Sequence, residues 1–209
     1  MLKNEHEVIE IFKKLESSNS IITTSAGSTS FVLIDLLYRS NSKIPVIFID
    51  TGFLFKETLE FYEQMKKNYD SIEFIRLESE YNKKDFIKDG RILNIEYCCK
   101  KNKVDVLRNY LLKNKIEYWI SGPRRDQTDL RKALSLYEKT NYGVTKVYPM
   151  LDWNEEDMMV YLKERKLPLN PLFYEGYESI GCYPCTKQGQ GRDGRWSGEK
   201  TECGLHVEK

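Results

Sequence analysis

The sequence predicts an α/β protein: a mostly parallel sheet with helices on both faces, followed by an irregular C-terminal tail. Short runs of β-branched and aromatic residues alternate with longer amphipathic segments, as expected of strand–helix units. One run is apolar almost throughout, as strands buried on both faces are. We expect the 209 residues to form a single domain. Its parts are an N-terminal helix (1–20), a nucleotide-binding α/β core (21–167) and a tail (168–209).

The elements follow one another along the chain. An amphipathic helix comes first, because Val8, Ile11, Phe12 and Leu15 fall at helical spacing. The β-rich run 21–24 then leads through small and hydroxyl residues into a helix, and the apolar run 45–49 is the next strand. Later strands are expected at 72–77 and 117–121, and the helices at 31–38, 57–67, 104–112 and 155–165.

The tail differs from the core in composition. Residues 168–209 contain three prolines, seven glycines and three cysteines and show no sustained periodicity. Long irregular segments on compact domains are usually functional or disordered. The cysteines and aromatic residues favour a function, so we expect the tail to bind a metal centre and to carry out chemistry.

Charge and targeting signals narrow the function classes. Lysine and arginine total 33 against 32 aspartates and glutamates, which gives no reason to expect nucleic acid or a membrane surface as partner. No segment has the roughly 20 apolar residues of a membrane span, and residues 1–20 do not resemble a signal peptide. We therefore expect a cytoplasmic protein, whose five cysteines serve a metal or catalysis rather than disulfides.

The loop between the first strand and its helix is a candidate anion site. A glycine and hydroxyl residues at this position offer backbone N–H groups to a phosphate. Small residues also occur there without any function, and the Walker pattern is absent. The candidate residues are Ser25, Gly27, Ser28, Thr29 and Ser30.

Two further motifs follow strand ends, where α/β proteins bind ligands. Asp50, Thr51 and Gly52 end the second strand, although a turn with a helix cap explains them equally well. Arg124 and Arg125 follow the fourth strand, with Arg131 further on. Paired arginines grip phosphate or sulfate, and the alternative is a solvated helix start.

Four cysteines form two groups. Cys98 and Cys99 are adjacent, and Cys182 and Cys185 form a C-x-x-C pair. Zinc ligands usually lie two to four residues apart, so adjacent cysteines fit a multi-iron cluster better than a single zinc ion. A redox pair is the other interpretation of C-x-x-C.

The fifth cysteine, Cys203, lies beside a glycine near the C-terminus. A thiol in a mobile tail can reach a substrate and then a partner protein, and His206 is close enough to influence it. Glu202 opposes thiolate formation, so cations such as Arg192 and Arg195 must favour it. The alternative is a surface thiol without function.

Together, these segments resemble the assimilatory adenylyl-sulfate (APS) and phosphoadenylyl-sulfate (PAPS) reductase family, from about residue 21 to residue 206. The resemblance rests on segments 25–30, 50–58, 122–127 and 200–206, in the family's order; the last, Lys-Thr-Glu-Cys-Gly-Leu-His, is highly specific. It implies an adenine nucleotide alpha-hydrolase-like fold. The cysteine set implies the iron–sulfur APS reductase branch, with a [4Fe–4S] cluster on Cys98, Cys99, Cys182 and Cys185.

The resemblance also implies a reaction. The Cys203 thiolate attacks the sulfur of adenylyl sulfate, displaces AMP and becomes an S-sulfocysteine. Thioredoxin or glutaredoxin then releases sulfite, a step of assimilatory sulfate reduction that leads toward cysteine biosynthesis. Lys103 matches a lysine between cluster and sulfate, and Arg192 and Arg195 match arginines near the phosphosulfate. The chain departs from the family in lacking an acidic residue in the phosphate loop and in having Pro123.

Three alternatives stay open at this point. The first alternative is the same reaction on 3′-phosphoadenylyl sulfate, which is the substrate of family members without the cluster. The second is an adenylating or sulfurtransferase enzyme of the related nucleotide-loop fold, a class that includes enzymes that modify tRNA. Such enzymes also use cysteines and clusters, although their loop usually contains an aspartate. A non-catalytic cluster-bearing sensor leaves the arginines and the tail motif unexplained. The sequence does not decide the oligomeric state, and a homo-oligomer is possible.

Overall fold

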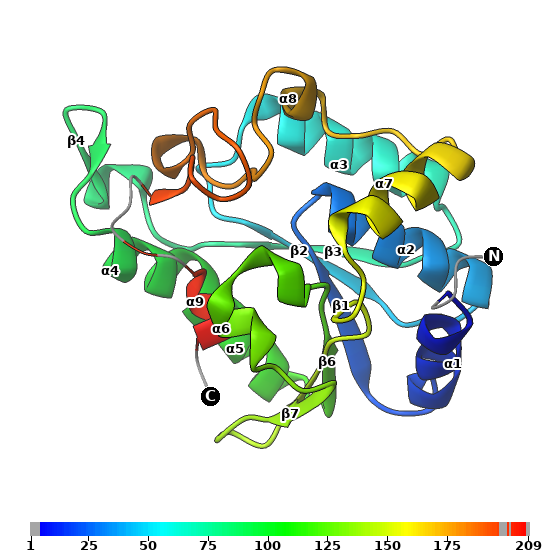
Figure 1. Ribbon diagram of the computed structural model, residues 1–209. Coiled ribbons are helices and arrows are strands. Elements are labelled where there is room, and N and C mark those ends of the chain that lie inside the picture. Colours follow the sequence, from blue (N-terminus) through cyan, green and yellow to red (C-terminus); the bar gives the residue numbers. More distant parts are fainter. Residues whose placement is uncertain (1–4, 197–199, 201, 208–209) are drawn as a thin grey trace.

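The computed structural model describes residues 5–196, 200 and 202–207, with the backbone alone at 206 and 207. At its centre is a six-stranded sheet in the order β3-β2-β1-β6-β8-β7 (Figure 1). The strands are β1 (Ser20–Thr24), β2 (Val46–Asp50), β3 (Phe74–Glu78), β6 (Tyr118–Ile120), β7 (Tyr137–Lys139) and β8 (Thr145–Val147).

The sheet is parallel except at one edge. Ile22 of β1 lies beside Val46 of β2 on one side and Ile120 of β6 on the other. The pairs β2–β3 and β6–β8 are also parallel, and only β7 runs antiparallel to its neighbour β8. The mostly parallel sheet predicted from the sequence is confirmed.

Helices surround the sheet, and short elements fill the connections. The helices are α1 (Glu5–Leu15), α2 (Ser28–Ser40), α3 (Lys56–Asn68), α4 (Ile95–Cys99), α5 (Asp105–Lys113), α6 (Asp129–Lys132), α7 (Glu155–Glu164), α8 (Pro171–Tyr174) and α9 (Gly204–Val207). A π-helical turn, Lys100–Val104, joins α4 to α5. A small hairpin of β4 (Ile87–Lys88) and β5 (Arg91–Ile92) precedes α4. None of the described helices is long and apolar enough to cross a membrane.

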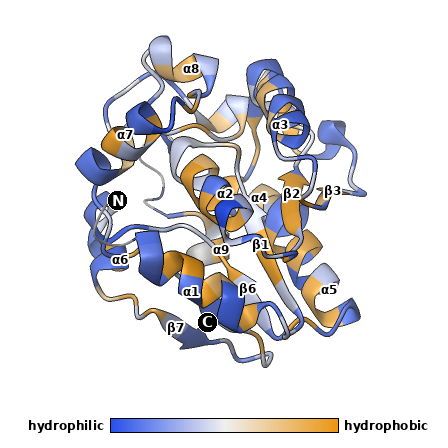
Figure 2. Cartoon of the chain, turned by 90° about the vertical axis from the view of Figure 1, so that its right-hand side faces the viewer, coloured by the Kyte–Doolittle hydropathy of each residue, from blue (hydrophilic) through white to orange (hydrophobic). Residues whose placement is uncertain are grey.

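The alternation of side chains along the strands explains why both faces carry helices. Ile22 and Phe48 pack with α1, α2, α3 and α7 on one face. Ile21 and Ile47 point to the other face, where they pack with residues of α5, among them Leu107. Hydrophobic residues accordingly gather along the central strands, and hydrophilic ones cover the outer sides of the helices (Figure 2).

Four of the six strands and the longer helices lie where the sequence predicts them, with ends shifted by a few residues. The prediction missed β7 and β8, which are only three residues long each. Lys146 occupies the centre of β8, so no apolar run marks that strand. The tail, predicted to be irregular, contains the short helices α8 and α9.

The order of the strands in the sheet indicates where a ligand-binding crevice lies. From β1 the chain moves outward to β2 and β3, whereas β6 returns to the other side of β1. Open parallel sheets bind ligands in the crevice at such a reversal, beyond the carboxyl ends of the strands. Residues 25–30 follow β1 and residues 121–123 follow β6, so both loops border this crevice.

Candidate active site

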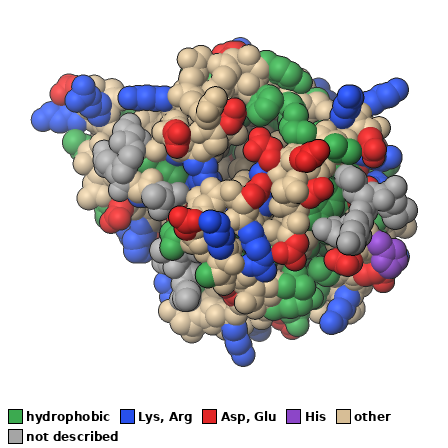
Figure 3. All heavy atoms as spheres, in the orientation of Figure 1, with side chains coloured by type: hydrophobic (Ala, Val, Ile, Leu, Met, Phe, Trp, Pro, Cys, Tyr) green, Lys and Arg blue, Asp and Glu red, His purple; other side chains and the backbone are tan. Residues whose placement is uncertain are grey.

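A cavity of about 230 Å³ lies at this crevice, and it brings together residues that are far apart in the sequence. Lysine, arginine and acidic side chains surround a hollow on the face shown in Figure 3. Nine of the predicted site residues line the cavity: Ser25, Gly27, Ser28, Thr29, Ser30, Lys103, Arg192, Arg195 and Cys203. The loop 25–30 and Cys203 therefore border the same cavity.

The loop 25–30 is shaped by its own hydrogen bonds. Ala26 has a left-handed backbone (φ 54°) and donates its N–H to Thr24 Oγ1 at 3.1 Å. The N–H of Ser25 is held by Ser30 Oγ at 3.2 Å. Gly27 precedes α2 and has no side chain to cap the first turn of that helix. The N–H groups of this turn are thus available to an anion in the cavity.

The two adjacent arginines after β6 are absent from the cavity lining. Arg124 is buried and donates from Nη1 to Thr29 Oγ1 at 2.8 Å, so it braces the loop from behind. Arg125 points elsewhere, to Asp152 Oδ1 at 2.9 Å and to the carbonyl of Lys132 at 3.0 Å. The structure thus gives Arg124 and Arg125 partners within the protein, and their direct contact with a ligand stays a prediction.

The motif after β2 likewise does not line the cavity. Asp50 forms an ion pair with Arg76 of β3 and accepts the N–H of Gly52 at 2.8 Å. Thr51 faces the cysteine group, with Oγ1 3.2 Å from Cys182 Sγ. These residues shape the turn at the strand end, and Thr51 is a neighbour of the predicted cluster ligands.

Burial and nearby cations act in opposite directions on Cys203. Burial raises the pKa of its thiol, but the ammonium of Lys103, the backbone N–H of Leu205 and the cations of Lys200 and Arg195 outweigh it and lower the pKa below its ordinary value. The effect is mutual, since the charge of Cys203 raises the pKa of Lys103 against the opposing effect of burial. The site therefore favours the thiolate, which is the nucleophilic form.

Two arginines of the tail stack on one indole. The guanidinium carbons of Arg192 and Arg195 lie 5.2 and 4.3 Å from the ring centroid of Trp196. Burial lowers the pKa of Arg192 to about 10 and also lowers that of Arg195. Arg195 packs so closely on Gly181 that a Cβ there would lie 2.6 Å from its Cζ. Trp196, which the sequence did not single out, thus fixes two cations beside the cavity.

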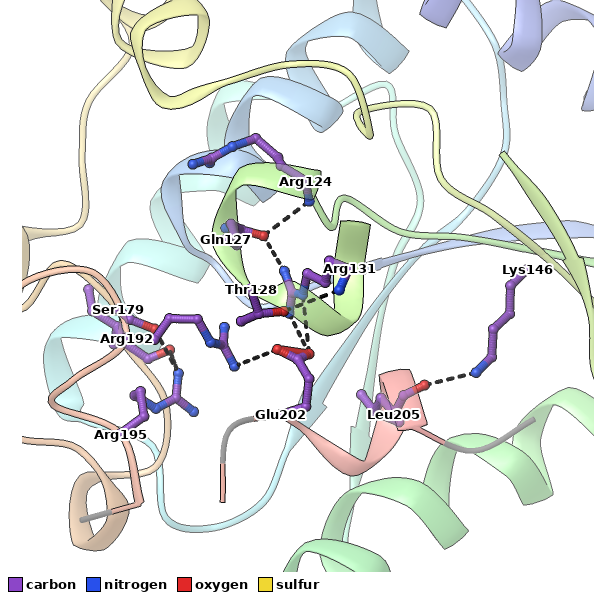
Figure 4. A network of polar contacts seen from close by, with 11 residues as sticks. Arg124, Gln127, Thr128, Arg131, Lys146, Ser179, Arg192, Arg195, Glu202 and Leu205 are labelled. Atoms are coloured by element: carbon purple, nitrogen blue, oxygen red, sulfur yellow. Dashed lines mark hydrogen bonds and ion pairs between the residues drawn. The ribbon is translucent and has the colours of Figure 1, made fainter. Parts of the chain in front are cut away.

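Polar contacts connect the tail to α6, as Figure 4 shows. Arg131 and Gln127 line the cavity, and both bind other members of this network. Arg131 donates from Nη2 to Glu202 Oε2 at 2.8 Å, and Arg192 Nη2 lies 3.2 Å from Glu202 Oε1. Glu202 is therefore paired with two cations. The prediction that its charge acts on Cys203 did not include these partners, which lie 71 and 10 positions away in the sequence.

A second anchor holds the end of the tail. Lys146 of β8 donates from Nζ to the carbonyl of Leu205 at 3.0 Å. Leu205 also packs against the core on the α5 face of the sheet. The side chain of His206, predicted to influence Cys203, lies outside the described residues.

The four remaining cysteines meet next to the main cavity. Cys98, Cys99, Cys182 and Cys185 all line a small cavity of about 20 Å³, and Lys103 and Arg195 line both cavities. The N–H of Tyr183 donates to the carbonyl of Phe53 at 2.8 Å, which holds the C-x-x-C pair against the loop after β2. Sequence spacing alone grouped these cysteines, and the structure brings the two groups together.

The chemistry of these four thiols fits a cationic centre. Burial, followed by the charges of Cys182, Cys99 and Cys98, raises the pKa of Cys185 to about 12. Burial also raises the pKa of Cys98. Four neighbouring thiolates need positive charge between them, which metal ions supply. Among the described residues, no group of three or more histidine, cysteine or acidic side chains is arranged to hold a single metal ion. The four cysteines line the small cavity together.

Known proteins resemble the chain over most of its length. A family model described as the phosphoadenosine phosphosulfate reductase domain matches residues 19–188. The adenosine 5'-phosphosulfate reductase 2 of Bacillus subtilis is 34% identical over 217 residues, covering 99% of this chain and 91% of that protein. The adenosine 5'-phosphosulfate reductase of Halalkalibacterium halodurans is 35% identical over 214 residues, covering 98% and 92%.

A solved structure shares the fold. The phosphoadenylyl-sulfate reductase of Candida auris, crystallised as a phosphate complex, superimposes with a TM-score of 0.71 at 23% sequence identity. The match covers 87% of this chain and 89% of that one. At this identity, the likeness concerns the arrangement of the sheet and helices.

Proposed function

The chain belongs to the phosphoadenosine phosphosulfate reductase family of enzymes, and from that premise we propose that it reduces adenylyl sulfate to sulfite and AMP. One observation carries the proposal: Cys203, with its lowered pKa, lines the same cavity as the phosphate loop 25–30, Lys103 and Arg195. A nucleophile, an anion-binding loop and cations are what attack on an adenylyl sulfate requires.

In the first stage, the Sγ–sulfur bond forms as the bond from sulfate sulfur to the bridging phosphate oxygen breaks. AMP leaves with that oxygen, and Cys203 keeps the sulfonate as S-sulfocysteine. Both reactants are anionic, so cations must offset their repulsion. Lys103, Arg192 and Arg195 line the cavity beside Cys203 and are suited to that role.

In the second stage, a dithiol protein supplies two electrons. Its first thiolate attacks Cys203 Sγ, releases sulfite and forms a mixed disulfide. Its second thiol then releases Cys203 as thiolate and leaves as a disulfide. Thioredoxin or glutaredoxin is the reductant proposed, in the cytoplasm, where such dithiols are kept reduced.

We propose that Cys98, Cys99, Cys182 and Cys185 hold a [4Fe–4S] cluster. When bound, the cluster supplies positive iron centres to the four thiolates and a fixed charge beside the substrate cavity. Lys103 and Arg195 line both cavities, so their positive charges would lie beside the cluster and the substrate at the same time. Asn102 Nδ2, 3.5 Å from Cys98 Sγ, is placed to support one ligand.

Metal analysis tests this cofactor. Protein purified without oxygen should be brown and contain iron and acid-labile sulfide in equal amounts, about four of each per chain. Cys185→Ser should lose the iron, because it removes a ligand. Cys203→Ser should keep it, because Cys203 does not line the cysteine cavity. Stoichiometric zinc without iron would contradict the proposal.

Substrate preference tests the position within the family. We expect sulfite release to be at least about tenfold more efficient with adenylyl sulfate than with its 3′-phosphorylated form, a difference of about 1.4 kcal/mol in transition-state binding. The motivation is the complete cysteine set, since the resemblance links it to adenylyl sulfate. Steady-state rates with a thioredoxin measure this preference, and the reverse order would assign the chain to the alternative substrate.

A further inference from the structure

The carboxylate of Glu202 is unusual because it is buried directly beside the proposed nucleophile. Its residue is only 5% exposed, and it immediately precedes Cys203. A buried carboxylate is costly unless cations and hydrogen bonds compensate it. Arg131 compensates one oxygen with two donors, Nε at 3.1 Å and Nη2 at 2.8 Å. Arg192 lies 3.2 Å from the other oxygen.

The cations come from two different parts of the fold. Arg131 belongs to α6, whereas Arg192 belongs to the tail before Trp196. Arg131 is itself fixed, because its Nη1 donates to Gln127 Oε1 and its backbone N–H donates to Thr128 Oγ1 at 3.3 Å. Glu202 therefore ties the segment that carries Cys203 to a rigid point beyond β6.

The same network reaches the phosphate loop. Gln127 Oε1 also accepts the backbone N–H of Arg124 at 3.1 Å, and the guanidinium of Arg124 donates to Thr29 Oγ1 at 2.8 Å. A continuous series of contacts thus runs from the loop that would bind phosphate to the residue before the nucleophile. Figure 4 shows its part from Arg124 to Glu202. Movement of Glu202 away from that loop requires breaking its ion pair with Arg131.

We propose that Glu202 is a positioning residue: its ion pairs with Arg131 and Arg192 hold Cys203 in the substrate cavity, and their opening exposes Cys203 to a partner thiol. The inference rests on the proposed role of Cys203 and adds to it the contact that decides where this thiol lies. Leu205, bonded to Lys146 on the other side of Cys203, supplies the second fixed point.

Alkylation of Cys203 tests this role without substrate or reductant. The rate of modification by iodoacetamide is followed by peptide mass spectrometry on cluster-bearing protein, up to the pH at which the rate no longer rises. At that plateau the thiol is fully ionised, so the rate reports exposure and not pKa. Glu202→Gln and Glu202→Ala should raise the plateau rate at Cys203 about tenfold or more, because each leaves buried arginines unpaired.

The matched control is Asp129→Asn, which breaks an exposed pair with Lys132 on the same helix as Arg131. It should change the rate by less than about twofold. Arg131→Gln opens the network from the core side and should act like the Glu202 variants. If those variants fold poorly, this one still decides the question.

The modification rates of the other cysteines distinguish local opening around Cys203 from unfolding of the whole protein. The proposal requires faster modification of Cys203 while Cys185 stays protected and iron is retained. Unchanged plateau rates in the Glu202 and Arg131 variants, or an equal rise at Cys185, would overturn it. Because the measurement uses no nucleotide, absence of sulfite formation by the wild type would refute the proposed function and leave this test intact.

Discussion

Cys203→Ser is expected to abolish sulfite formation. A serine hydroxyl stays protonated at neutral pH, whereas the environment of Cys203 favours the thiolate. The wild type, given adenylyl sulfate without reductant, should stop after one turnover, with one sulfonate on Cys203 and one AMP released per chain. Intact-protein and peptide mass spectrometry measure both, and thioredoxin added afterwards should release the sulfonate as sulfite.

The variant provides its own control. Cys203→Ser leaves the loop 25–30 and the cysteine cavity unaltered, so it should bind AMP and retain iron while forming no adduct. Loss of iron would indicate that the substitution disturbs the neighbouring site. An adduct on another cysteine, or sulfite turnover by the serine variant, would assign the nucleophile elsewhere.

The sequence predicted the individual motifs of this site better than the contacts between them. The small residues at 25–30 and the cysteine groups follow from local pattern, because strand-to-helix loops and metal ligands have recognisable spacing. The meeting of loop 25–30 with Cys203 depends on β6 lying next to β1, a long-range pairing that no local pattern contains.

The sequence did not identify the partners that Arg124 and Arg125 have within the fold. Arg124 and Arg125 are adjacent, yet one braces Thr29 and the other binds Asp152. Arginine has a long, flexible side chain, so its partner is decided by which acceptors the fold brings within reach. Glu202 shows the same limit: sequence proximity to Cys203 suggested repulsion, whereas tertiary contacts with Arg131 and Arg192 compensate its charge.

The two cavities share Lys103, and this shared position has a physical origin. Cys98 and Cys99 belong to α4, and the π-helical turn Lys100–Val104 follows directly. A π-helical turn widens the helix and shifts the side chains that follow it, and such turns are frequent at functional sites. Here the turn carries Lys103 between the cysteine group and Cys203. A cluster bound at one cavity would thereby act on the nucleophile in the other through Lys103, and through Arg195, which also lines both cavities.

Lys103→Ala should therefore lower kcat by about a hundredfold or more, since it removes a preorganised cation from the point where negative charge is concentrated. It should also change the pH dependence of Cys203 alkylation. Lys103 lowers the pKa of Cys203, so its removal raises that pKa. The reactive thiolate is lost as pH falls through the pKa, and the acid limb of the profile should consequently move to higher pH.

Lys100→Ala is the matched control, because Lys100 lies on the same turn but is exposed and paired with Asp105. It should leave both kcat and the profile near their wild-type values, and iron content, measured in parallel, should be equal in the two variants. An unshifted acid limb in Lys103→Ala with iron retained would show that Lys103 does not act on Cys203, and the cationic stabilisation would then fall to Arg192 and Arg195.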